Sequence, residues 1–288
     1  MTERLRFPAE WEPQSAILMA WPHAGTDWAP RLQSVQDCFA GLCSAISQYQ
    51  PLLLLVPDDG IEANAIAALT ASCARMTSVR FIRLPYNDTW LRDSGPITLR
   101  EGDGFRLLDF HFTAWGGKFE AGLDDQLVVG MAAMGLFGNA RHQRIDFALE
   151  GGGIETDGAG TLLSTWHCLH ERHPQATREA IEAQLKTALQ QDRILWLEHG
   201  YLEGDDTDAH IDTLARLCPN KTIIYVACDD PSDEHYESLK VMELELMQFP
   251  GYRLLPLPWP SARFDAGGER LPATYANYLV INGAVLVP

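Results

Sequence analysis

The stretch Ala148-Leu149-Glu150-Gly151-Gly152-Gly153 ends one predicted β-strand, residues 144–149, and precedes a second, residues 161–165. Three consecutive glycines permit a tight, closely packed backbone after the first strand. Such a turn would expose the carboxyl group of Glu150 next to a ligand. A plain structural turn explains the glycines alone equally well. No Lys-Ser/Thr pair follows them, so the pattern does not favour a phosphate-binding loop.

Two further polar stretches lie just after or between apolar segments in the same way. They are Trp90-Leu91-Arg92-Asp93 and His210-Ile211-Asp212. Asp93 and Glu150 are 57 residues apart, and Glu150 and His210 are 60 residues apart. A repeat of this length indicates similar units around a common axis, each contributing a polar group to the centre. An ordinary alternating α/β fold is the alternative.

Short apolar strands alternate with amphipathic helices along the chain, which predicts an α/β fold. The predicted strands are residues 52–56, 79–84, 105–112, 144–149, 161–165, 193–198, 222–227 and 252–257, and the predicted helices are 35–49, 176–190 and 231–248. Asp230 and Pro231 suit the cap and first position of the last helix. Asn282-Gly283 predicts a terminal β-hairpin. No low-complexity linker interrupts the sequence, so we expect a single domain over residues 1–288.

The net charge of −17 and the isoelectric point of about 4.8 disfavour nucleic acid as a partner and favour small cations, although solubility alone explains the acidic charge equally well. The first 15 residues lack the apolar run of a secretory leader, and the longest apolar run, residues 52–56, is too short to span a bilayer. We therefore expect a cytoplasmic protein without membrane contact. The six cysteines show no CxxC spacing, and each is expected to be reduced.

His210 and Asp212 are two residues apart, so in an extended segment both side chains would project into one pocket. Asp205, Asp206 and Asp208 precede them. So many titratable groups are difficult to place in an apolar core, and they suit a cation-binding, proton-transferring site. A structural histidine bonded to a nearby acid is the alternative. Zinc-ligand patterns such as HxH and HExxH are absent, so we expect no metal and no cofactor.

The segment Asn87–Pro96 places Asp93 near a Gly-Pro turn, where its carboxylate could bind a planar guanidinium group through two parallel hydrogen bonds. Trp90 and Trp115 could supply flat walls for a cation. A surface ion pair for Asp93 and core positions for the tryptophans are the alternatives.

Taken together, five stretches resemble the agmatine deiminases and the bacterial peptidylarginine deiminase-like proteins of the guanidine-modifying superfamily. They are NDTWLRDSGP at 87–96, AWGGK at 114–118, LEGGGIETDGAGTLLST at 149–165, GDDTDAHIDTLAR at 204–216 and YANYLVINGAVLVP at 275–288. The resemblance spans the whole chain, in order. It implies a pentein-type α/β propeller, in which ββαβ units surround a pseudo-fivefold axis.

The resemblance also implies a role for each matching residue. Asp93 and Asp212 would hold the substrate guanidinium, His210 would be the general acid and base, and Glu150 would orient His210 or a substrate nitrogen. Trp90, Asp206 and the turn of Trp115, Gly116 and Gly117 would lie near the rest of the substrate.

The implied reaction converts agmatine and water to N-carbamoylputrescine and ammonia, a step towards putrescine. A thiolate attacks the guanidinium carbon, His210 protonates the departing ammonia, and water then hydrolyses the amidino-thioether. The chain departs from the family in lacking the Gly-rich segment that ends in His-Cys and supplies this thiolate. Ala209 also replaces a usual glycine, and residues 169–174 differ from the family pattern. Because the sequence stops at Pro288, we expect an incomplete last unit, a C-terminally truncated domain and an inactive chain.

Several alternatives remain open on the sequence. The chain could be a non-catalytic guanidine-binding paralogue, or a deiminase or amidinotransferase acting on arginine, peptidyl-arginine or another guanidine. A metallohydrolase using His210, Asp212 and Glu150 is a further alternative. Homo-oligomerisation is also left open.

Overall fold

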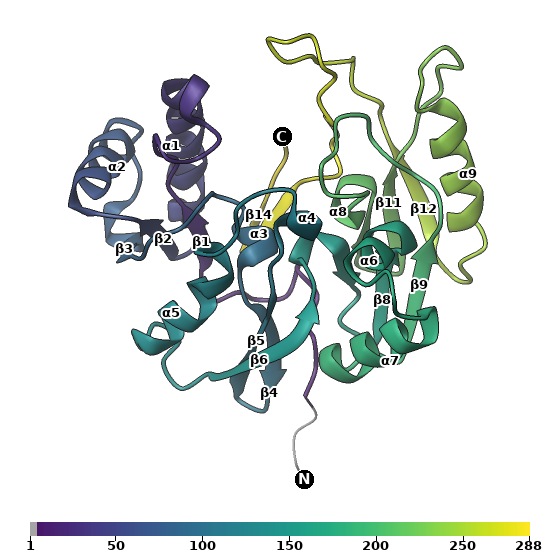
Figure 1. Ribbon diagram of the computed structural model, residues 1–288, viewed down its shortest axis with the longest axis horizontal. Helices are drawn as coiled ribbons and strands as arrows, with labels where there is room; N and C mark the ends of the chain where they lie inside the picture. The colour runs from purple at the N-terminus through teal and green to yellow at the C-terminus, as the bar shows by residue number, and fades with distance from the viewer. Residues whose placement is uncertain (1–4) are drawn as a thin grey trace.

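The computed structural model describes residues 5–288, whose strands form five separate small sheets. The longer helices lie towards the periphery, and the short helices α3, α4 and α8 lie near the centre (Figure 1). The helices are α1 (Leu32–Tyr49), α2 (Asp59–Ala71), α3 (Leu91–Ser94), α4 (Ala114–Gly117), α5 (Leu127–Ala133), α6 (Trp166–Arg172), α7 (Arg178–Leu189), α8 (Ile211–Leu214) and α9 (Tyr236–Leu246). Single 3₁₀ turns are η1 (Ala29–Arg31), η2 (Met76–Ser78), η3 (Asp124–Gln126) and η4 (Gly151–Gly153).

Three of the sheets share one topology. Each has a first pair of antiparallel strands and a third strand that runs parallel to the second. Their strands are β4 (Ile97–Glu101), β5 (Gly104–His111) and β6 (Arg141–Ala148); β7 (Ile154–Thr156), β8 (Thr161–Thr165) and β9 (Arg193–Leu197); and β10 (Ala215–Cys218), β11 (Thr222–Val226) and β12 (Arg253–Leu257). A helical crossover precedes each third strand, which makes each unit a ββαβ unit.

The first sheet is wholly parallel, and the last is a two-stranded hairpin. The first contains β1 (Ile17–Ala20), β2 (Leu52–Val56) and β3 (Val79–Arg83), and the hairpin contains β13 (Leu279–Ile281) and β14 (Ala284–Leu286). Gly283 in the hairpin turn has a φ of +85°, as the Asn-Gly pair predicted. Five small sheets joined in this way confirm the predicted pentein-type fold.

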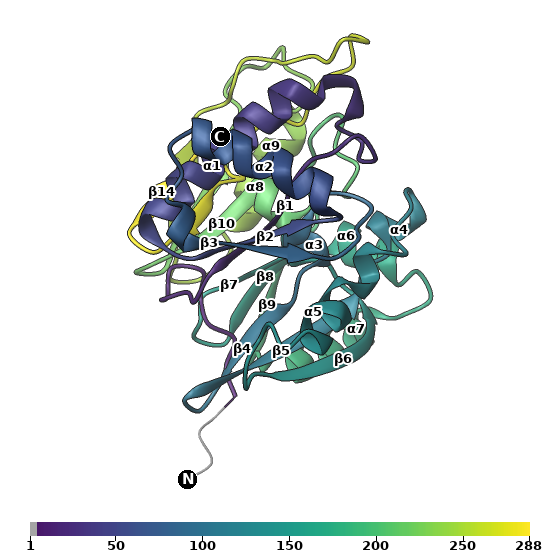
Figure 2. The same ribbon diagram turned by 90° about the vertical axis from the view of Figure 1, so that its left-hand side faces the viewer.

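Helices packed between neighbouring sheets hold the five sheets together in a ring. Helices α1 and α2 cover one face of the first sheet (Figure 2), and α5 of the second unit packs on the other face through Leu127 and Met131. Helix α7 packs with the second and third sheets, and α9 packs with the third and fourth. Ile281 of the hairpin belongs to the same apolar cluster as Trp21 of the first unit, which links the two ends of the ring.

Most predicted elements form within a few residues of their expected bounds, but the helix predicted at 231–248 begins later, at Tyr236. The Asp230 carboxylate accepts hydrogen bonds from the backbone and side chain of Ser232, which closes a local turn. Asp230 and Pro231 therefore form a turn instead of the predicted cap. Among residues 5–288, no helix combines the length and the apolar composition that crossing a bilayer requires.

Candidate functional site

The three polar stretches that repeat in the sequence occupy equivalent places in the fold. Each forms a short turn directly before the first strand of a ββαβ unit: α3 before β4, η4 before β7 and α8 before β10. The turn η4 contacts both α3 and α8. The repeat in the sequence therefore corresponds to a structural repeat, and it brings Asp93, Glu150, His210 and Asp212 to one place.

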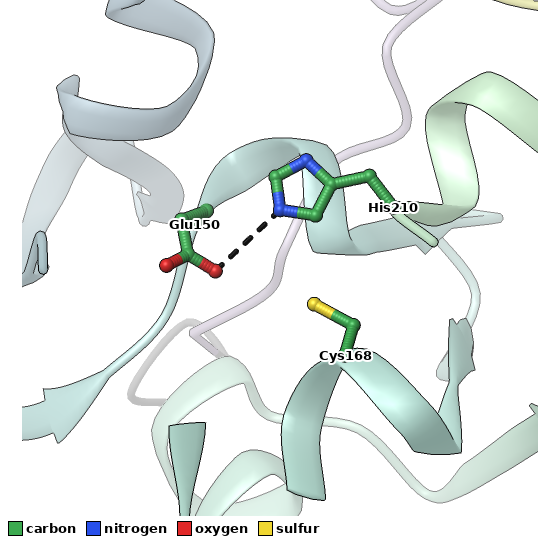
Figure 3. Close-up of side chains that lie close together, drawn as sticks. All are labelled: Glu150, Cys168 and His210. Carbon is green, nitrogen blue, oxygen red and sulfur yellow. Dashed lines mark ion pairs between the residues drawn. The ribbon is translucent and has the colours of Figure 1, made fainter. Parts of the chain in front are cut away.

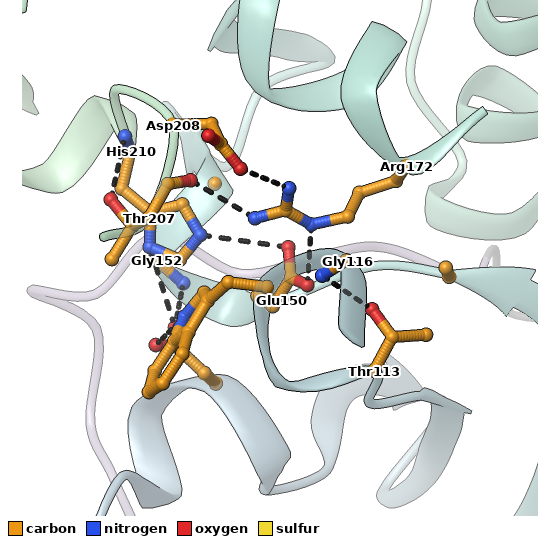
Figure 4. A network of polar contacts seen from close by, with 12 residues as sticks. Thr113, Gly116, Glu150, Gly152, Arg172, Thr207, Asp208 and His210 are labelled. Atoms are coloured by element: carbon orange, nitrogen blue, oxygen red, sulfur yellow. Dashed lines mark hydrogen bonds and ion pairs between the residues drawn. The ribbon is translucent and has the colours of Figure 1, made fainter. Parts of the chain in front are cut away.

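His210 lies at the centre of this cluster, and only 2% of the residue is exposed. Its Nδ1 lies 3.7 Å from Oδ1 of Asp93, and its Nε2 lies 3.5 Å from Oε2 of Glu150. Figure 4 shows the imidazole within this polar network. Burial opposes a positive charge on the ring, but Asp93, Cys168 and Glu150 outweigh it and hold the pKa of His210 well above its usual value.

Gly152 allows three side chains to converge. A Cβ atom at this position would lie 2.4 Å from Nδ1 of His210, 2.7 Å from Oδ1 of Asp93 and 3.0 Å from Oδ2 of Asp212. The Gly152 N–H also donates a 2.9 Å hydrogen bond to Oδ1 of Asp93. The middle glycine of the triplet thus has a specific steric role, because any side chain would displace the cluster.

His210 and Asp212 lie together as predicted, but the prediction that an extended segment brings them together is wrong. The segment is not extended, because His210 occupies the position just before helix α8 and Asp212 lies in the first turn of that helix. Ala209, before them, has a φ of +64°, in the left-handed region that favours glycine. This conformation explains why a glycine is usual there.

Asp93 and Asp212 are both buried, with 8% and 5% of each residue exposed. Oδ2 of Asp93 accepts a 3.1 Å hydrogen bond from Nε1 of Trp115, and burial raises the pKa of Asp93 although His210 opposes this. Nε of Arg92 lies 3.6 Å from Oδ2 of Asp212. Oδ1 of Asp212 has no hydrogen-bond partner among residues 5–288, so it is a buried acceptor available to a donor.

Glu150 is held by Arg172, a residue that the sequence did not indicate. Nε of Arg172 donates a 2.8 Å hydrogen bond to Oε1 of Glu150, and the same guanidinium binds Oδ2 of Asp208 at 2.6 Å and the carbonyl of Thr207 at 3.0 Å (Figure 4). Burial opposes ionisation of Glu150, but His210 and Arg172 together lower its pKa. Arg172 thus links Glu150 to the loop that precedes His210.

The residues predicted to bind the substrate differ in how far they are buried. Trp90 is 42% exposed, and its ring meets the buried ring of Trp115 edge to face at 5.9 Å. Gly116 and Gly117 both have a φ of +87° in the turn that carries Trp115. Asp206 is exposed, and in the described part of the chain its carboxylate makes no hydrogen bond or ion pair. Only its backbone carbonyl is engaged, by Nζ of Lys118.

Cys168 also lies at the site, although the sequence analysis predicted no role for it beyond that of a reduced cysteine. Its Sγ lies within 4.8 Å of ligand atoms of Glu150 and His210 (Figure 3). Burial raises the pKa of its thiol, and His210 acts in the opposite direction. No local motif surrounds Cys168 or Arg172, because helix α6 brings both to the cluster from a different part of the chain from the three turns.

Comparison with known proteins gives a consistent result. The profile of the Porphyromonas-type peptidyl-arginine deiminase family matches residues 6–288. The chain is 32% identical to an agmatine deiminase of Pseudomonas aeruginosa (strain UCBPP-PA14), over 98% of this chain and 83% of that protein. An agmatine deiminase of Ectopseudomonas mendocina is 33% identical, over 98% of this chain and 82% of that protein.

The fold is also similar to solved structures. One is a cysteine-to-serine variant of the C. jejuni agmatine deiminase with substrate bound, with a TM-score of 0.92 and 35% identity, over 99% of this chain and 83% of that one. Another is the agmatine deiminase of Enterococcus faecalis, with a TM-score of 0.88 and 27% identity over the same shares. The extent of these matches, together with the fold and the shared motifs, shows that the chain belongs to the Porphyromonas-type peptidyl-arginine deiminase family.

Proposed function

We propose that this chain binds a small guanidino cation, with agmatine as the first candidate, in the manner of an agmatine deiminase-type hydrolase. The observation that carries the proposal is the convergence of Asp93 and Asp212 on His210, with Oδ1 of Asp212 left without a partner. Two carboxylates in a buried site suit the charge and the flat donor pattern of a guanidinium group. The relatives named as agmatine deiminases support agmatine as the ligand.

In this proposal the buried groups have separate roles. Asp93 and Asp212 would fix the guanidinium, and the hydrogen bond from Trp115 would orient Asp93. His210, whose pKa the nearby carboxylates and thiol raise, would protonate the departing ammonia. Glu150 would hold the imidazole in place. The reaction would release ammonia and N-carbamoylputrescine.

We further propose that these 288 residues bind the ligand without turning it over. The reaction needs a thiolate nucleophile, and Cys168 is a poor one because burial raises its pKa. The other cysteines support this view: two are exposed, two lie in apolar clusters and one contacts a tyrosine hydroxyl, namely Cys38, Cys73, Cys43, Cys228 and Cys218. The second candidate function is therefore that of a guanidine-binding paralogue of the deiminases that has no catalytic activity.

Titration calorimetry with agmatine and with arginine tests the binding proposal. Asp93→Asn and Asp212→Asn should each weaken agmatine binding roughly 10- to 100-fold, because each removes a charged hydrogen-bond acceptor that contributes about 1.5–3 kcal/mol. Asp146→Asn is the matched control, since it removes the same charge from a fully exposed side chain. Equal affinities for all four proteins would refute the proposed site. An ammonia-release assay tests turnover, and ammonia release would refute the proposed inactivity.

A further inference from the structure

Glu150, Cys168 and His210 form a set of three ligand-type side chains, of which the thiol has no role in the proposed deiminase chemistry. One ligand atom from each lies within 4.8 Å of the other two. The residues are 1%, 0% and 2% exposed, so they are not an accidental surface cluster. Figure 3 shows the sulfur of Cys168 directed towards the space beside the Glu150–His210 pair.

The second observation is that Nε2 of His210 is buried and has no hydrogen-bond partner among the described residues. Its closest carboxylate oxygen, Oε2 of Glu150, is 3.5 Å away, which is long for a hydrogen bond. A buried polar nitrogen left in this state costs free energy. Two ligands bound to Zn²⁺ at 2.0–2.1 Å and at a tetrahedral angle lie about 3.3 Å apart. The observed 3.5 Å between Nε2 of His210 and Oε2 of Glu150 therefore suits two ligand atoms of one ion.

The backbone leaves room beside these atoms. A Cβ atom at Gly153 would lie 3.4 Å from Sγ of Cys168 and 3.9 Å from Nε2 of His210. The glycine thus keeps a side chain away from both ligand atoms. Three ligands fill three corners of a tetrahedron and leave the fourth open for water or another small ligand.

We propose that Glu150, Cys168 and His210 bind a Zn²⁺-type divalent cation. On binding, the Cys168 thiol and the Nε2 of a protonated His210 each release a proton to the solvent, and the thiolate and the Glu150 carboxylate then balance the two positive charges of the ion. The ion bonds to Nε2 of His210, so that nitrogen cannot carry a proton while the ion is bound. The metal-binding step does not depend on which guanidine the protein binds.

Titration of the reduced, chelator-treated protein with Co²⁺ and then Zn²⁺ tests the proposal. One equivalent of Co²⁺ should give visible bands of a tetrahedral ion and a thiolate-to-cobalt charge-transfer band, and Zn²⁺ should remove both. Cys168→Ser should abolish the charge-transfer band. It should also weaken Zn²⁺ binding, measured by competition with a chelating dye, at least about 100-fold, the upper range for loss of even an outer-shell partner. Cys43→Ser is the control, because Cys43 is equally buried and its thiol lies in an apolar cluster, where it donates to Met19 Sδ.

Unchanged binding by Cys168→Ser, or no stoichiometric binding by the unsubstituted chain, would overturn the proposal. A hydroxyl in place of a buried thiol can disturb folding, so a second measurement uses the unsubstituted chain. X-ray absorption at the zinc edge, with one equivalent bound, should show one sulfur at about 2.3 Å and nitrogen or oxygen neighbours at about 2.0–2.1 Å. A coordination shell without sulfur would contradict the assignment.

Discussion

Replacing Arg172 with methionine should destabilise the protein strongly, because it removes the buried cation that holds two carboxylates. The Arg172 side chain is fully enclosed and binds Glu150 and Asp208, while Glu150 itself is 1% exposed. Breaking a buried pair by removing one partner leaves a charge without compensation, which costs about 3–5 kcal/mol. Since the total stability of a domain is about 5–15 kcal/mol, the variant should still fold and be measurable.

Urea denaturation followed by tryptophan fluorescence and by circular dichroism measures this loss, and coincident transitions justify a two-state analysis. Glu150→Gln combined with Arg172→Met should recover part of the loss, because the double variant no longer buries an unpaired carboxylate. We expect a coupling energy of at least about 1 kcal/mol. Arg83→Met is the control: Arg83 binds Asp59 and Glu62 at the surface, so its loss should shift the midpoint little.

A small loss for Arg172→Met, similar to that for Arg83→Met, would refute this reasoning. Additive effects of the two substitutions at the buried pair would also refute it. Either result would mean that His210 and the solvent, rather than Arg172, compensate the charge of Glu150.

Two further predictions concern the packing of the site and the effect of pH. Gly152→Ala should destabilise the protein by about 1–3 kcal/mol and abolish agmatine binding, because the methyl group would meet Asp93, His210 and Asp212 at 2.4–3.0 Å; unchanged calorimetric affinity would contradict the steric role. Burial raises the pKa of Asp124 to about 6, although the backbone N–H groups of Asn87 and Asp88 oppose the shift. The folded state therefore binds more protons than the unfolded state between about pH 4 and 6, so this group makes stability fall as pH rises through that range. Asp124→Asn should remove that part of the pH dependence of the denaturation midpoint, and an unchanged slope would argue against it.

The sequence predicted the fold well where apolar strands carry their own signal. Residues 52–56, 161–165 and 193–197 are apolar runs or alternations that form strands close to the expected bounds. It missed β1, β4, β7 and β10. The strand β1 is an apolar run of only four residues, and β7 has three residues and contains Glu155, which is buried and forms an ion pair with Arg216. A buried ion pair forms only in the folded chain. In the sequence Glu155 is therefore simply a charged residue, and it interrupts the apolar pattern by which strands are predicted.

The candidate site was predictable only in part, and the reason lies in how it is assembled. Asp93, Glu150 and His210 occur at a regular spacing because each lies in the turn that begins a ββαβ unit, so a repeat in the sequence reports their shared position. Arg172 and Cys168 reach the same place from helix α6, which follows the second strand of its unit and is not one of the three turns of the repeat. Spacing along a chain can reveal groups that symmetry-related turns carry to the centre. Groups from outside those turns, here the guanidinium of Arg172 that binds Glu150 and the thiol of Cys168 beside His210, are found only when distances in space are known.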